Sequence, residues 1–261
     1  MTRVTRFGVL VIGDEIVNGK RTDKHFPHVI ESLEERGMQL AWSIHTGDER
    51  KHLVKALQWT QQDDIPVFCF GGIGATPDDR TRQAAAEAFG ARLVRHPEAL
   101  QLIERQFGTD AYPNRVLMAD LPEDCLLIPN NVNRIAGFTL YDHHFFPGFP
   151  AMAWPMLEWV LDRYYPFSAP RMHERSLRLL QVPESDLIDL MDTMVRCHPD
   201  VKLFSLPRMG DAASIEIGFR GEEGAVEAAF TELLSVVGSP DCDFIIDESC
   251  ADPGLTNRAV V

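Results

Sequence analysis

The sequence predicts an α/β fold in which a doubly wound, mostly parallel sheet is followed by a small α+β domain. The runs 7–12 and 67–70 contain no polar side chain, which is typical of strands buried on both faces of a parallel sheet. Segments with helical spacing separate the runs, and right-handed crossovers connect such strands into one sheet. Beyond residue 166 the expected order changes to βαββαβ, which indicates a second domain.

The first part of the chain is expected to alternate strands and helices. Gly37 stands where a left-handed residue would end the helix 25–36. Thr76 and Asp79 are spaced as a capping box for the helix 81–89. The stretch 114–150 is expected to form a β-meander with long loops at the sheet edge. The expected strands are 7–12, 40–45, 67–70, 92–94, 125–128 and 138–141, and the expected helices are 25–36, 48–62, 81–89, 97–107 and 152–164.

A proline-bounded segment, 166–170, is the expected linker to the second domain. The later elements are a strand at 171–182, a helix at 184–197, strands at 201–206 and 214–219 around the turn 208–211, a helix at 222–237 and a strand at 243–247. This order is the ferredoxin-like split motif. The expected domains are therefore 1–166 and 167–261, the latter with a frayed tail after Ser249.

Composition excludes several classes of function. Lys and Arg number 25 against 39 Asp and Glu, a formal charge of −14, which opposes nucleic-acid binding. No apolar stretch approaches the ~20 residues of a membrane span, and the first apolar run is too short for a signal peptide. The five cysteines form no Cys-x-x-Cys pair, so we expect reduced thiols in a cytoplasmic protein that has no membrane partner.

Two acidic residues, Asp14 and Glu15, follow the first strand and Gly13. The segment 13–20 superficially resembles a phosphate-binding P-loop, but five residues separate its glycines and Arg21 follows Lys20. Carboxylates at the carboxyl end of a buried strand are suited to holding a divalent metal or to accepting hydrogen bonds from a sugar or ring N–H. The alternative is a solvated turn that caps the next helix.

The segment 71–81, Gly-Gly-Ile-Gly-Ala-Thr-Pro-Asp-Asp-Arg-Thr, is the most informative motif. Glycines let backbone N–H groups approach a phosphate, and the helix that follows offers further donors at its N-terminus. Asp78 and Asp79 would then bind a metal or deprotonate a nucleophile. The alternative role is that one aspartate caps the helix.

The remaining motifs are less specific. Pro147-Gly-Phe-Pro150 is a rigid turn. The pairs His25/His28 and His143/His144 lack a third metal ligand by spacing, so we interpret them as surface or core-edge histidines. There is no Gly-x-Ser-x-Gly elbow and no His-Glu-x-x-His helix, so a serine hydrolase or metalloprotease has no support.

Taken together, these residues resemble the molybdopterin-binding (MoaB/Mog) domain family. The motifs are Ile12-Gly-Asp-Glu15 with Gly19, Thr46-Gly-Asp48, the segment 71–81, Asn114 with Leu121-Pro122, and Pro147-Gly-x-Pro150. Their order and spacing most resemble the amino-terminal domain of the competence/damage-inducible protein CinA. The resemblance covers roughly residues 6–165 and implies a MoaB/Mog-like sheet.

The resemblance implies a small phosphorylated ligand and two chemistries at one cleft. One is the hydrolysis of a nucleotide pyrophosphate such as ADP-ribose, dependent on magnesium, manganese or cobalt, and the other is the binding or adenylylation of molybdopterin. A non-catalytic ligand-binding module is the third reading. Relatives in cofactor biosynthesis are commonly oligomeric, which implies a homo-oligomer. The implied sites are phosphate or ligand binding by Gly13, Gly71, Gly72, Gly74, Thr76, Thr81, Pro147 and Gly148, catalysis by Asp78 and Asp79, and metal binding by Asp14, Glu15 and Asp79.

Some positions depart from the family pattern. The Gly-Thr-Ala-Pro-Gly segment of the family is Asn133-Arg134-Ile135-Ala-Gly137 here, and Met152 replaces an acidic residue. The segments Gly74-Ala-Thr76 and Asp23-Lys24 also differ from CinA. The loss of a carboxylate at Met152 removes a metal ligand or base, whereas Arg134 adds a contact for phosphate.

Overall fold

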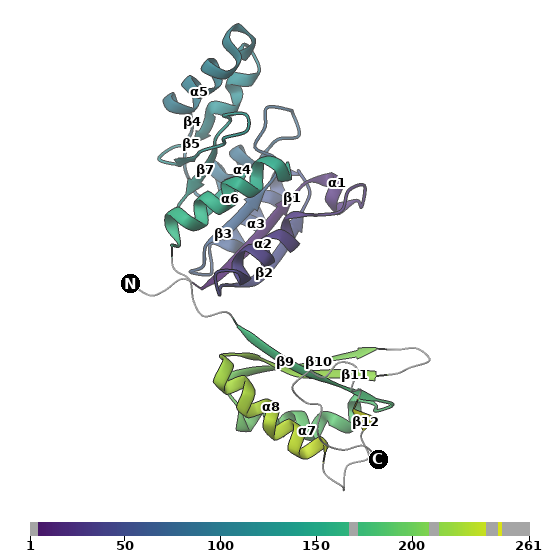
Figure 1. The fold of residues 1–261 in the computed structure, drawn as a ribbon. Coiled ribbons are helices and arrows are strands. Elements are labelled where there is room, and N and C mark those ends of the chain that lie inside the picture. Colours follow the sequence, from purple (N-terminus) through teal and green to yellow (C-terminus); the bar gives the residue numbers. More distant parts are fainter. Residues whose placement is uncertain (1–4, 167–171, 209–213, 239–244, 247–261) are drawn as a thin grey trace. The chain divides into compact units, whose positions relative to one another are not determined.

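The computed structural model describes residues 5–166, 172–208, 214–238 and 245–246. The chain divides into two compact units, Met1–Ala169 and Pro170–Val261, which Figure 1 shows. Most of the expected linker 166–170 and of the expected turn 208–211 lies outside the described residues, as does the tail after Ser249.

A six-stranded sheet forms the centre of the first unit, in the order β2-β1-β3-β8-β7-β6. The first four strands in that order run parallel, whereas β7 and β6 are antiparallel to their neighbours. This arrangement confirms the doubly wound, mostly parallel sheet. The strands are β1 (Arg6–Ile12), β2 (Gln39–Thr46), β3 (Val67–Phe70), β6 (Leu126–Ile128), β7 (Gly137–Leu140) and β8 (His143–Phe146).

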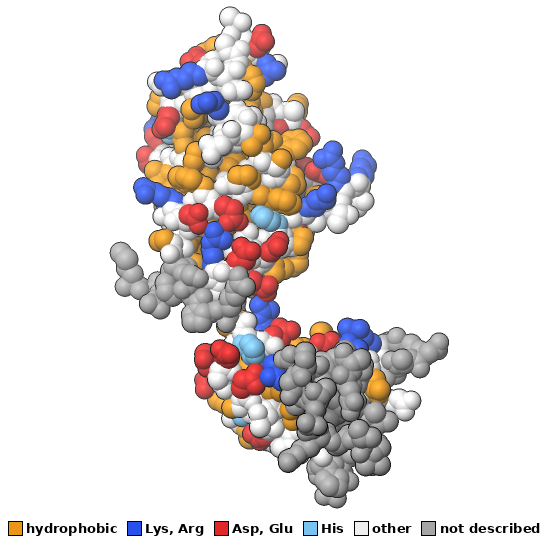
Figure 2. Space-filling model, viewed as in Figure 1, with side chains coloured by type: hydrophobic (Ala, Val, Ile, Leu, Met, Phe, Trp, Pro, Cys, Tyr) orange, Lys and Arg blue, Asp and Glu red, His pale blue; other side chains and the backbone are white. Residues whose placement is uncertain are grey.

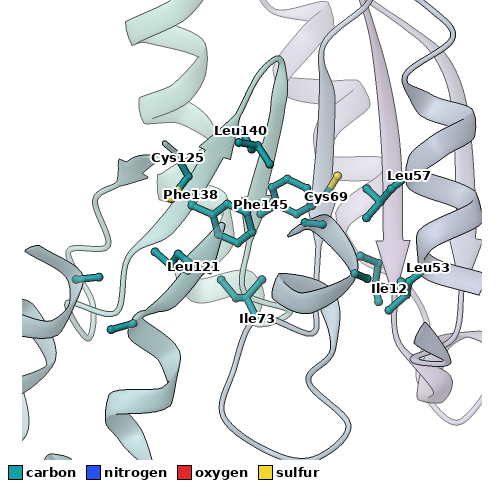
Figure 3. Close-up of a cluster of buried hydrophobic side chains, with 14 of the residues drawn as sticks. Ile12, Leu53, Leu57, Cys69, Ile73, Leu121, Cys125, Phe138, Leu140 and Phe145 are labelled. Atoms are coloured by element: carbon teal, nitrogen blue, oxygen red, sulfur yellow. The ribbon is translucent and has the colours of Figure 1, made fainter. Parts of the chain in front are cut away.

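Helices cover both faces of this sheet because its central strands are apolar on both sides. Val9 and Val11 of β1 pack with residues of α2 (His25–Glu34) and α6 (Pro150–Tyr164). Leu10 and Ile12 belong to a second buried cluster that includes residues of α3 (Arg50–Thr60), α4 (Thr81–Ala88) and α5 (Pro97–Phe107). Figure 3 shows part of this second cluster. The period of two along a strand thus sends successive side chains into two cores.

Short elements complete the first unit. The strands β4 (Leu93–Arg95) and β5 (Asp120–Pro122) pair antiparallel in a sheet of their own. The remaining elements are the four-residue helix α1 (Asp14–Val17) and the 3-10 helices η1 (Gly108–Ala111) and η2 (Arg115–Ala119).

Strand β8 is the main feature that the sequence did not predict. The expected meander included only two strands, whereas the structure adds His143–Phe146 between β3 and β7. His143 Nε2 lies 2.8 Å from Thr60 Oγ1. The two ring nitrogens of His144 lie within hydrogen-bond distance of the Thr139 and Tyr165 hydroxyl groups. Burial lowers the pKa of His143 to about 4 and that of His144 to about 3. The interpretation of this pair as surface or core-edge histidines is therefore wrong: both are neutral core side chains.

The second unit contains a four-stranded antiparallel sheet in the order β10-β11-β9-β12. Leu179 and Ile217 on this sheet pack with Phe230 and Leu233 of the longer helix. The strand order and the βαββαβ sequence of elements confirm the ferredoxin-like fold. The elements are β9 (His173–Leu180), η3 (Glu184–Leu187), α7 (Ile188–Cys197), β10 (Val201–Arg208), β11 (Ser214–Gly221), α8 (Glu223–Val237) and β12 (Ile245–Ile246).

The described residues also show the state of three cysteines and one apolar area of the surface. Within the described ranges, no helix is both long and apolar enough to cross a membrane. Cys69 and Cys125 are buried free thiols, and Cys197 is an exposed one. Figure 2 shows hydrophobic side chains gathered over α6 in the first unit.

Candidate functional site

Four parallel strands end at one edge of the sheet, and each is followed by a segment that the sequence analysis singled out. The segments are 13–15 after β1, 47–48 after β2, 71–81 after β3 and 147–148 after β8. The carboxyl ends of parallel strands are where open α/β sheets bind ligands. The topology therefore brings the predicted residues to one edge of the sheet.

Backbone atoms from three of these segments lie against one another. Gly71 donates its N–H to Phe146 O at 3.0 Å. Its φ is +108°, and a Cβ at this position would lie 2.1 Å from Ile12 O. A Cβ on Gly148 would lie 3.4 Å from Gly71 Cα. Glycine is required at position 71 because no side chain fits between the β1 and β8 ends.

The loop 71–76 is anchored by a buried side chain, while its backbone donors stay free. Ile73 packs in the core with Leu121, Phe138 and Phe145 (Figure 3). At the two ends of the loop, Thr81 N donates to Gly72 O at 3.0 Å and Thr76 N to Asp79 Oδ2 at 2.9 Å. Within the described chain, the backbone N–H groups of residues 72–75 donate to no protein acceptor. Consecutive N–H groups of a loop that are left free in this way are the kind of donor that binds anions.

Arg82 of α4 holds this loop from behind, a role that the sequence analysis missed. Its side chain is only 3% exposed. The guanidinium donates to Gly74 O at 2.7 Å, to Asp120 O at 2.8 Å and to Leu117 O. Burial lowers the pKa of Arg82. Through one carbonyl of the glycine loop and two of the 117–120 region, Arg82 fixes these two segments to each other.

Asp78 and Asp79 take different positions in the loop. The Asp79 carboxylate accepts from both the N–H and the hydroxyl of Thr76. Helix α4 begins at Thr81 after Arg80, with no side-chain cap. The predicted capping box is therefore wrong, because Asp79 closes a turn ahead of the helix instead. Asp78 is exposed, and its pKa is lowered because the Thr76 side chain and the backbone N–H of Asp78 stabilise its charge.

Thr81, a predicted phosphate contact, is fully buried. Its hydroxyl has no hydrogen-bond partner among the described residues. A Cβ on Gly72 would lie 2.3 Å from this oxygen. The hydroxyl thus lies against Gly72 of the glycine loop.

Asp14 pairs with Asp48, a residue that was not among the predicted site residues. Asp14 N donates to Asp48 Oδ2 at 2.9 Å, and Asp48 N donates to Asp14 Oδ1 at 3.1 Å. Burial raises the pKa of Asp48, and the like charges of Asp14, Glu15 and Asp78 raise it further. Carboxylates from three strand ends therefore lie within electrostatic reach of Asp48.

These carboxylates do not form a ready-made metal cage. In the part of the chain that is described, no three His, Cys, Asp or Glu side chains are grouped so that they could hold a metal ion. Magnesium is commonly bound by one or two carboxylates together with substrate phosphates and water. The donor chemistry at this edge fits a cation of that kind, held jointly with a phosphorylated ligand.

His25 ties the Pro147–Gly148 turn to helix α2. The side chain is 6% exposed and stacks on Phe70 with ring centroids 4.4 Å apart. Its Nε2 lies 3.1 Å from Gly148 O, which can only accept, so Nε2 carries the proton. Asp23 accepts from the backbone N–H groups of His25 and Phe26. Of the His25/His28 pair, His25 therefore lies at the candidate site as a buried contact.

The positions that depart from the family pattern are structured. Asn133 Oδ1 accepts from Asn130 Nδ2 and Ile135 N, which closes the loop that carries the exposed Arg134. Because Phe138 of β7 pairs with Phe145 of β8, this loop lies at the edge where β8 ends. Met152 is half-buried in the first turn of α6.

The fold and this edge define a class: a doubly wound α/β domain that presents a glycine loop and acidic side chains beyond its parallel strands. A family described as "Probable molybdopterin binding domain" matches residues 8–167. The chain belongs to this molybdopterin-binding domain family, and the resemblance seen in the sequence is confirmed.

The relatives include CinA-like proteins. One from Syntrophotalea carbinolica is 35% identical over 176 residues, 64% of this chain and 41% of the relative. Another from Geotalea uraniireducens is 28% identical over 269 aligned residues, 98% of this chain and 62% of the relative. A crystal structure of CinA, of unknown function, from Thermoplasma acidophilum matches with a TM-score of 0.56 at 25% identity and covers 60% of this chain and 96% of that one. This chain thus spans less than two thirds of either curated relative.

Proposed function

We propose that the edge formed by segments 13–15, 47–48, 71–81 and 147–148 binds a phosphorylated small molecule. We further propose that the chain hydrolyses a nucleotide pyrophosphate such as ADP-ribose with a divalent cation. The observation that carries the proposal is the set of free N–H groups at residues 72–75 on an edge that also bears Asp48 and the three carboxylates whose charges act on it. One group attracts phosphate oxygens, and the other requires a cation between itself and a phosphate.

The backbone of the glycine loop binds the phosphate in this proposal. The N–H groups of residues 72–75 donate to phosphate oxygens, and Ile73 keeps their positions fixed from below. Arg82 contributes positive charge behind the loop, while its two Nη atoms donate to three carbonyl groups. Asp79 keeps the Thr76 turn closed.

Asp14, Glu15 and Asp78 are the residues that we assign to the cation, magnesium, manganese or cobalt. When bound, such a cation neutralises charge on the phosphate oxygens and favours attack by water. Asp48 accepts the proton of the attacking water, since its carboxylate is oriented by the backbone N–H of Asp14 and its pKa is raised. Water adds to one phosphorus and the bridging P–O bond breaks, so ADP-ribose yields AMP and ribose 5-phosphate.

A second candidate is the binding or adenylylation of molybdopterin, which the family description favours. It uses the same loop for the phosphate of the pterin. A non-catalytic binding module is the third, and the replacement of an acidic residue by Met152 favours it. We also propose that the protein acts as a homo-oligomer in the cytoplasm.

Product release from ADP-ribose tests the hydrolase. The full chain is assayed with magnesium, manganese or cobalt, beside Asp78→Asn and Asp64→Asn. Asp64 is an exposed carboxylate that precedes β3 and so lies toward the opposite end of the strand. We expect turnover to depend on metal, to fall at least 100-fold in Asp78→Asn and to persist in Asp64→Asn.

The other outcomes separate the candidates. An absence of release with every metal, while ADP-ribose raises the melting temperature, contradicts the hydrolase and supports a binding module. A pterin that copurifies with the protein supports the molybdopterin candidate. Failure of all these ligands to change the melting temperature contradicts the phosphate site itself.

A further inference from the structure

Phe149 is an exposed aromatic side chain beside the candidate site. Its side chain belongs to the turn Pro147-Gly148-Phe149-Pro150 and is 61% exposed, although Phe145 and Phe146 just before it are fully buried. Within the described residues it makes no ring contact with another aromatic side chain. An exposed aromatic ring at the rim of a ligand site offers a flat apolar face that a ligand ring can contact.

The backbone that carries this ring is held on both sides. Phe149 O accepts from Met152 N and Ala153 N, both at 2.9 Å. On the other side, Gly148 O accepts from His25 Nε2. Proline at both ends of the turn fixes two further φ angles. Little backbone freedom remains to be lost when a ligand contacts the ring, which makes the turn a preorganised support.

The turn also has a fixed place relative to the phosphate loop. Gly148, the residue before Phe149, lies against Gly71, and the free N–H groups begin at residue 72. A ligand whose phosphate lies on those donors therefore has the turn as a neighbour on one side. Phe149 is uncharged, so the acidic side chains nearby do not oppose a neutral ring placed against it.

We propose that Phe149 is a stacking platform for a planar heteroaromatic ring, a purine or a pterin, attached to the bound phosphate. The proposal rests on the phosphate site of the proposed function, and it assigns a contact to the part of the ligand that lies beyond the phosphate. Stacking of a base on an aromatic side chain is sequence-tolerant and strong enough to govern affinity. Phe149 would thus decide between ring-bearing ligands and simple phosphates.

Calorimetric binding to the full chain tests this role with three ligands: ADP, a pterin phosphate and ring-free pyrophosphate. The variants are Phe149→Ala, Phe149→Trp as the conservative rescue, and Tyr141→Ala as the control. Tyr141 is 73% exposed and precedes β8, at the opposite end of the strand from Phe149. We expect Phe149→Ala to weaken binding of a ring-bearing ligand roughly 5- to 150-fold and to leave pyrophosphate unchanged.

Comparison of the three ligands identifies the kind of ring that stacks on Phe149 and shows which results contradict the proposal. Weaker binding of ADP alone assigns the platform to purines, and weaker binding of the pterin alone assigns it to pterins; rescue by Phe149→Trp supports stacking in either case. Equal loss of pyrophosphate and ADP overturns the platform, because the variant has then damaged the phosphate site. Unchanged affinities for all ligands in Phe149→Ala overturn it as well. If pyrophosphate fails to bind the unaltered protein, the proposed phosphate site fails, and the platform fails with it.

Discussion

Gly71 carries the closest backbone approach at the candidate site, and Gly71→Ala tests whether that approach is real. The added Cβ would lie 2.1 Å from Ile12 O, and the residue would keep a φ of +108°. Gly90, just beyond α4, offers a matched control. Its φ is +67°, and no atom lies within 4 Å of the position of a Cβ.

The two substitutions differ in magnitude for a physical reason. At Gly90, alanine only has to adopt a left-handed conformation, which costs about 1 kcal/mol of folding free energy. At Gly71, the backbone strain costs about 1–3 kcal/mol. Displacement of the β1 carbonyl adds a cost on the order of an overpacked core, about 1–3 kcal/mol. We expect Gly71→Ala to lose about 2–6 kcal/mol.

Urea unfolding followed by tryptophan fluorescence measures this difference. All four tryptophans, Trp42, Trp59, Trp154 and Trp159, lie in the first unit, so the signal reports that unit alone. With a slope of about 1–3 kcal/mol per molar urea, Gly71→Ala should lower the midpoint by about 0.7 M or more, at least about twice the shift of Gly90→Ala. Equal midpoints for the two variants would refute the packing of Gly71 against β1.

The other predictions concern buried polar side chains. Arg82→Met should destabilise the first unit by about 2–4 kcal/mol because three carbonyls lose a charged donor. The control Arg80→Met, at an exposed position, should change the stability by less than about 0.5 kcal/mol. Equal urea midpoints for the two variants would contradict this role of Arg82. His144 is neutral when folded, with a pKa of about 3, and protonates near pH 6.5 when unfolded. The stability it contributes is therefore complete above about pH 6.5 and is lost as the pH falls toward 3. His144→Gln should flatten this loss, and an unchanged pH profile in that variant would contradict it.

The central elements of the first unit were predictable because local pattern and burial agree there. Strands β1 and β3 are apolar throughout and are buried on both faces. The expected helix 97–107 matches α5, which begins with proline and buries Ala99 and Ile103 on one face. In such segments, the spacing of apolar residues in the sequence predicts the same secondary structure that burial in the fold requires.

The missed features depend on partners far away in the chain. His143 and His144 are polar by type, yet they occupy a central strand because Thr60, Thr139 and Tyr165 bind their nitrogens. No spacing within residues 143–146 reveals those partners.

The candidate site shows the same limit. The sequence placed Asp14, Asp78 and the glycine loop at strand ends, and the topology brings those ends together. The Asp14–Asp48 pairing depends on the parallel register that sets Ile12 beside Thr46. The role of Arg82 depends on carbonyls at residues 117 and 120, beyond the following helix. Register and long-range carbonyl contacts are set by packing and not by local sequence.

The position of β8 has a consequence for how the protein emerges from the ribosome. Strand β8 is the last of the six central strands in the chain, yet it lies between β3 and β7. Until residue 146 has been synthesised and has left the exit tunnel, β3 has an unpaired edge made of apolar residues. The Pro147–Gly148 turn is completed by the same event. A nascent chain that stops before β8 therefore lacks one of the four segments of the candidate site and exposes a strand that favours aggregation.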